Sequence, residues 1–123
     1  MAPALSIHEP RVLAADTIVG DKVVSTKNED LGTIRHLMID LEKGRIAYAV
    51  LSFGGFLGMG DKLFAIPWSA FGLDAPAHTF ILNIDQEKLQ NAPGFDQDNW
   101  PNMADQAWGN SVADYYGTAS YLG

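Results

Sequence analysis

The sequence contains no cysteine and few basic residues, and these two shortages exclude several classes of function. Without cysteine the chain has no disulfide, no thiolate metal site and no cysteine nucleophile, and such a composition fits a cytoplasmic protein. The 123 residues include 8 Lys and Arg against 15 Asp and Glu, which gives a net charge of −7. Because nucleic-acid binding depends on basic side chains that neutralise phosphates, we expect no nucleic-acid partner.

Long apolar runs are missing as well. No window reaches about 18 consecutive apolar residues, so we expect no transmembrane helix. The first residues lack the basic head and the sustained apolar stretch of a signal peptide. Apolar residues nevertheless make up 47% of the chain, which is ordinary for a folded protein and argues against disorder. The length and the lack of internal repeats suit one domain with a small core.

Short β-branched and apolar segments, separated by turn residues, dominate the first two thirds of the chain. Gly32 is expected at a positive-φ position, and residues 42–44 form a tight turn. The closely spaced segments predict a mainly β fold, a small antiparallel β-barrel followed by short C-terminal helices. The expected strands are residues 22–26, 33–41, 45–53, 62–68 and 79–84.

The two strands around the turn at residues 42–44 form a predicted hairpin that is apolar on both faces. In its first strand Leu37, Ile39 and Leu41 share one side. In its second strand alternation places Tyr48 and Val50 on one face and Ala49 and Leu51 on the other, and neither face carries charge. A barrel strand with one wet face would alternate apolar and polar residues. We therefore expect both faces to be covered by the C-terminal tail, by a second subunit, or by both.

The tail, residues 85–123, is acidic and rich in aromatic residues. It contains one basic and six acidic residues, and six of the 13 aromatic residues lie in its last 29 positions. Helices are expected at residues 86–91, up to Gly109, and from Ser111 to a stop at Gly117. Because each buried ring contributes a large apolar surface, we expect the tail to dock. We expect Trp100 and Trp108 to hold the tail in place and Trp68 to pack into the barrel.

The glycine-rich segment at residues 54–60 has the G-x-x-x-x-G spacing of a phosphate-binding loop. In such a loop Lys follows the second glycine directly and a helix begins there. Here Asp61 precedes Lys62, and a strand is expected to follow. We therefore interpret the glycines as a tight reversal between two strands. Its apolar residues either form a contact surface or fold inward over the barrel mouth; they are Phe56, Leu57 and Met59.

No pattern indicates catalysis, a cofactor or a metal. The three histidines lie in separate segments, and His36 is expected to be partly buried and hydrogen-bonded within its strand. Asp96 and Asp98 faintly resemble a calcium loop but lack its glycine and its terminal Glu. The serines lack a nucleophile elbow. We expect no catalytic, cofactor-binding or metal-binding residues, and we do not expect an enzyme.

Four motifs taken together resemble the PRC-barrel domain. They are "DLGTI" at 30–34, "IDLEKGRIAYAVLSFGG" at 39–55, "GDKLFAIPW" at 60–68 and "APGFDQDNWP" at 92–101. The chain is similar to the stand-alone bacterial form of this family over residues 18–117. The family includes the cytoplasmic domain of the photosynthetic reaction-centre H subunit, which assists proton delivery to a quinone. The resemblance implies a small β-barrel that acts by assembly and not by catalysis.

We therefore expect three segments: an extended arm at residues 1–17, the barrel at 18–84, and the helical tail at 85–123. The predicted function is a non-catalytic interaction module that forms a homodimer and binds a further protein partner. The alternative is a small-molecule or proton-handling accessory protein, with His36 or Asp61 at the barrel mouth. The interface candidates are Phe53, Phe56, Leu57, Met59, Trp100, Trp108, Tyr115 and Tyr116.

Overall fold

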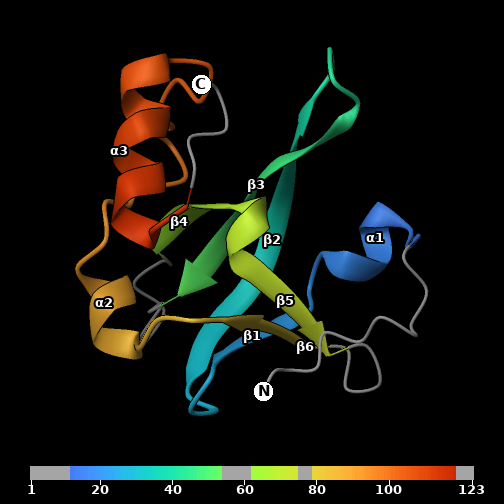
Figure 1. Cartoon of the computed structure of the whole chain (residues 1–123), viewed down its shortest axis with the longest axis vertical. Helices are drawn as coiled ribbons and strands as arrows, with labels where there is room; N and C mark the ends of the chain where they lie inside the picture. Colours follow the sequence, from blue (N-terminus) through green and yellow to red (C-terminus); the bar gives the residue numbers. More distant parts are fainter. Residues whose placement is uncertain (1–11, 54–61, 75–78, 119–123) are drawn as a thin grey trace.

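The β-branched segments fold into the strands that their composition predicts, and a computed structural model describes residues 12–53, 62–74 and 79–118. The described residues form one curled six-stranded sheet with short helices packed against it (Figure 1). This arrangement confirms the expected mainly β fold class. The strands are β1 (Lys22–Ser25), β2 (Asp30–Asp40), β3 (Arg45–Phe53), β4 (Lys62–Pro67), β5 (Phe71–Asp74) and β6 (Thr79–Leu82).

The strand order in the sheet is β4-β3-β2-β1-β6-β5. Neighbouring strands are antiparallel except β1 and β6, which run parallel from the Lys22↔Thr79 pair to the Ser25↔Leu82 pair. The sheet is therefore mixed, where local turns had predicted only antiparallel neighbours. A parallel pair joins segments distant in sequence, so no local turn announces it.

Gly32 has the expected positive φ, +103°, although it lies inside β2 and not before it. A side chain on Gly32 would collide with the backbone oxygen of Ser52 on the neighbouring strand β3. Glycine is therefore required both for its backbone conformation and for the close approach of two strands. β2 consequently begins at Asp30, which pairs with Val24, three residues earlier than the sequence predicted.

Two helices follow the sheet, and an aspartate caps each of them. The Asp85 side chain accepts a hydrogen bond from Lys88 N at the start of α2 (Gln86–Gln90), as expected. Asp105 caps α3 (Gln106–Tyr116) in the same way, by accepting from Trp108 N. The expected break after Gly109 is wrong, because α3 continues through it. Gly109 is buried within α3.

Three short elements were not expected from the sequence. β5 pairs with β6 across residues 75–78, which lie outside the described residues. A 3₁₀ turn at Trp68–Ala70 leads into β5, and Trp68 packs against Phe80 with ring centroids 5.6 Å apart. Helix α1 (Ala15–Ile18) occupies the end of the segment expected to be an extended arm.

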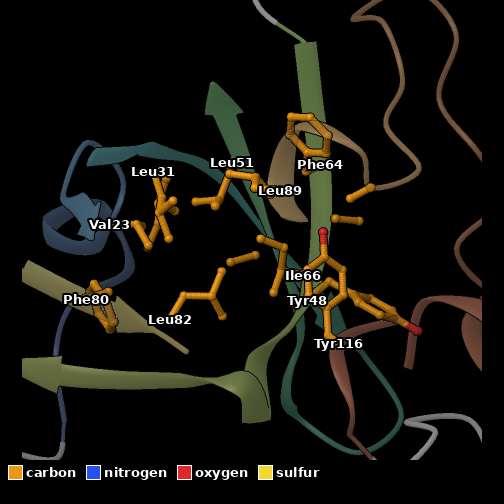
Figure 2. Close-up of a cluster of buried hydrophobic side chains, with 14 of the residues drawn as sticks. Val23, Leu31, Tyr48, Leu51, Phe64, Ile66, Phe80, Leu82, Leu89 and Tyr116 are labelled. Atoms are coloured by element: carbon orange, nitrogen blue, oxygen red, sulfur yellow. The ribbon is translucent and has the colours of Figure 1, made fainter. Parts of the chain in front are cut away.

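The core lies between the curled sheet and the two C-terminal helices (Figure 2). Leu89 of α2 and Tyr116 of α3 join the strand side chains in a single cluster. Side chains therefore pack the centre of the described fold. The largest fully buried side chains are Phe64, Leu31, Ile34, Leu51, Ile66, Leu82, Leu89, Val23 and Val50.

Candidate interaction surface

Strand β3 is covered on both faces, as its composition predicts. The register pairs Val50 with Ala65 on one face and Leu51 with Phe64 on the other. Every residue of β3 from Ala47 to Ser52 is buried within the single chain. The apolar character of both faces is therefore explained without a second subunit along this part of the hairpin.

The C-terminal tail supplies the cover on the face that carries Tyr48 and Val50. Trp108 of α3 packs edge-on against Tyr48, with ring centroids 5.2 Å apart. Before α3, Phe95 forms an isolated antiparallel bridge with Leu63 of the edge strand β4. The tail thus contacts the barrel both through rings and through the backbone.

Trp100 lies on the same face but keeps more of its ring in solvent. Its ring meets His36 edge-on at 5.2 Å and Phe95 at 5.1 Å, and 37% of the residue is exposed. His36 is itself exposed, so the expectation of a partly buried histidine is wrong. The His36↔Val50 pair sets the position of His36 in the strand, where its side chain stays in contact with water.

Tyr115 and Tyr116 attach the end of α3 to the rest of the chain. The Tyr115 hydroxyl donates a hydrogen bond to Lys88 O, and Lys88 Nζ lies 5.2 Å from the centre of the Tyr115 ring. Tyr116 is buried in the core cluster. Burial, and secondarily the neighbouring Tyr115, raises the pKa of the Tyr116 hydroxyl above its usual value. Both tyrosines therefore contribute to packing within the chain.

We call the end of the β2–β3 hairpin, residues 38–47, the hairpin tip; among the described strands, none other than β2 and β3 themselves pairs with it. The β1–β2 register ends at Thr33, and β4 pairs with β3 only from Tyr48 onward. The tip therefore extends as a two-stranded ribbon past the other strands (Figure 1). It carries two apolar side chains in solvent, Ile39 at 48% and Leu41 at 89% exposure.

A groove of about 410 Å³ lies beside the hairpin tip. One side is formed by the tip and the other by the loop that precedes α3. Apolar residues make most of the lining, and two carboxylates stand at its rim. The groove is lined by Met38, Ile39, Asp40, Glu42, Ala47, Tyr48, Met103 and Ala104.

The structure places the interface candidates in different environments. Phe56, Leu57 and Met59, like Asp61, lie outside the described residues. Phe53 is half-buried against the core. Of the described candidates, Trp100 is the most exposed, whereas the other three tail residues, Trp108, Tyr115 and Tyr116, are half-buried or buried.

Sequence reasoning did not select the hairpin tip as a candidate surface. The signal was present, because Ile39 and Leu41 stand at the end of a strand next to a charged turn. The alternation pattern assigned both residues to a covered face. The pattern gives the face of a strand, but it cannot tell where along the strand its neighbours stop.

The described residues show neither a metal-binding cluster nor a membrane-crossing helix. No three His, Asp or Glu side chains among those residues gather closely enough to hold a metal ion. The longest helix in the same part of the chain, α3, has 11 residues. A span needs about 20, and no described helix qualifies.

The sequence identifies the family. The family model for the PRC-barrel domain matches residues 10–89, and the chain belongs to this family. A search among curated proteins finds no match. Among solved structures the chain is similar to a 16S ribosomal RNA processing protein, RimM, from Pseudomonas aeruginosa, with 20% sequence identity and a TM-score of 0.45. That match covers 66% of this chain, which spans about half (49%) of the length of the RimM chain.

Proposed function

We propose that this chain is a non-catalytic PRC-barrel module that acts by binding proteins, a second copy of itself among them. The supporting observation is the exposed apolar surface of the hairpin tip, Ile39 and Leu41, which continues into an apolar groove. Exposed apolar side chains that adjoin a groove are typical of protein-binding surfaces. Of the three segments expected from the sequence, the barrel presents this surface and the tail completes it through Met103 and Ala104.

Sedimentation velocity over a micromolar concentration series tests the self-association. We expect the weight-average mass to rise from that of one chain toward that of two. A mass that stays at one chain over the whole series would contradict self-association. Affinity capture from the protein's own cells, compared with a variant that carries Leu41→Gln, then tests for a further partner. A partner that uses the tip is retained by the parent chain and lost from the variant.

The alternative, a small-molecule or proton-handling protein with a pocket at the barrel mouth, receives less support. Side chains such as Phe64, Leu51 and Leu82 pack the described interior, and the glycine-rich segment expected at the barrel mouth lies outside the described residues. His36 lies outside the barrel against Trp100. A cytoplasmic location stays a prediction from the cysteine-free composition.

A further inference from the structure

The geometry points to a reciprocal dimer in which the hairpin tip of one copy, led by Leu41, fills the groove beside the tip of the other copy. This inference rests on the proposed self-association and names the surface that carries it. Leu41 is 89% exposed, the same fraction as Val12 near the described start of the chain. Leu41 differs from Val12 in standing at the rim of an apolar groove, between the lining residues Asp40 and Glu42.

Because Leu41 lies close to the groove of its own chain, a pair of copies can form both contacts and leave neither Leu41 nor groove open to a third copy. In a two-fold dimer, residue i of one copy meets residue j of the other, and j meets i. Because Leu41 and the groove adjoin in one chain, a two-fold axis beside the tip lets both contacts form in one continuous interface. If Leu41 and the groove lay on opposite sides of the chain, head-to-tail contacts would instead produce open chains or rings.

The open edges of the tip favour the same arrangement. Among the described residues, no third strand pairs with the part of the hairpin beyond Ile34 on β2 or before Tyr48 on β3. A two-stranded ribbon is marginally stable in water without a further layer. The second copy would supply that layer and remove Ile39 and Leu41 from solvent.

Charge indicates why the occupant is a second copy. The whole chain has a net charge of −7, so two copies repel each other over most of their surfaces. Within residues 38–47, however, two acidic residues are balanced by two basic ones, and the net charge is zero. The tip is therefore a place where two acidic copies can meet without net repulsion.

The groove lining suits a leucine side chain that is presented by a turn. Met38 and Met103 contribute flexible thioethers, which adapt to an inserted apolar group. The Asp40 Oδ1 atom accepts hydrogen bonds from Glu42 N at 2.9 Å and Lys43 N at 3.1 Å. These bonds fix the turn that presents Leu41, so little ordering is needed when the contact forms.

Sedimentation of a Leu41→Gln variant tests the surface, with Val12→Gln as the matched control of equal exposure. Because two symmetry-related leucines are removed, we expect the dimer dissociation constant to rise about a hundredfold. The control should keep the parent value, and thermal unfolding of both monomers should be unchanged. A parent dimer that Leu41→Gln leaves intact would overturn the inference but not the proposed self-association. A parent monomer would overturn both.

Disulfide trapping tests the reciprocal contact directly, because the chain has no native cysteine. A chain with Leu41→Cys is mixed with a chain carrying Ala104→Cys, which lies in the groove lining, and the mixture is oxidised. We expect a disulfide-linked pair of the two variants. Val12→Cys mixed with Ala104→Cys serves as the control. Equal yields from the two mixtures would overturn the placement of Leu41 in the partner's groove.

Discussion

Leu63 and Phe95 are joined by two backbone hydrogen bonds, from Leu63 N to Phe95 O at 2.9 Å and from Phe95 N to Leu63 O at 2.8 Å. Leu63 belongs to β4, the strand at one edge of the sheet. The loop after α2 thus occupies hydrogen-bonding groups that an edge strand would otherwise offer to another chain. The bridge also fixes the start of the segment that covers β3.

Gly94→Ala should weaken this attachment. A Cβ at position 94 would lie 2.6 Å from the Lys62 Cε atom and 2.9 Å from the Leu63 backbone oxygen. The lysine end can move, but the backbone oxygen is part of the bridge and cannot. We expect a loss of about 1–3 kcal/mol in the free energy of unfolding, measured with urea. Gln97→Ala, an exposed change in the same loop, is the control, and equal stability of the two variants would contradict the claim.

Gly32→Ala and Gly44→Ala separate backbone conformation from steric contact. Both glycines have positive φ, but a Cβ on Gly44 would meet open space, whereas one on Gly32 would collide with Ser52 O. We expect Gly44→Ala to lower the free energy of unfolding by about 1 kcal/mol, because alanine is strained in the left-handed conformation. Gly32→Ala should cost clearly more, because β2 and β3 must also separate. Similar midpoints in thermal unfolding would show that the strand contact is unimportant.

Trp108→Ala should expose the outer face of β3. The Trp108 ring packs on Tyr48, and its loss would leave an apolar face in water. We expect a loss of about 3 kcal/mol in the free energy of unfolding, together with increased binding of a dye that reports apolar surface. Trp100→Ala is the matched comparison, and it should cost less because its ring is more exposed. The reverse order would show that Trp100 is the residue that holds the tail.

Tyr116→Phe should leave the chain at least as stable as the parent near neutral pH. The Tyr116 hydroxyl is buried and has no hydrogen-bond partner among the described residues, so phenylalanine removes an unsatisfied polar group. A loss above about 1 kcal/mol in urea unfolding would instead indicate a hydrogen bond to the hydroxyl.

The same variant carries a pH prediction. Burial raises the pKa of folded Tyr116, so the unfolded chain releases its proton first as pH rises. Ionisation of Tyr116 therefore leaves the free energy of unfolding unchanged below about pH 10, the usual pKa of tyrosine in an unfolded chain, and lowers it as the pH rises above that value. Tyr116→Phe should lose less stability than the parent between neutral and strongly alkaline pH. Parallel pH profiles for the two chains would contradict the raised pKa.

Local patterns were sufficient for the elements whose cause is local. The hairpin of β2 and β3 follows from two apolar strands around a short charged turn, and α2 begins after Asp85, whose side chain accepts a backbone hydrogen bond three residues on. β5 was missed, although it is antiparallel to the next strand along the chain, β6. The continuity of α3 through Gly109 could not be read locally, since burial of that glycine depends on what the helix packs against.

The sequence by itself determined the mainly β class, the family, and the apolar character of β3 on both faces, since composition and alternation express these properties residue by residue. Only the tertiary structure decided what covers those faces and where the cover ends. Trp108 reaches Tyr48 across 60 positions of sequence, and the loop at Phe95 reaches Leu63 across 32. Ile39 and Leu41 stay exposed because β1 and β4 stop short of them. Such contacts join distant segments, so no local periodicity can encode them.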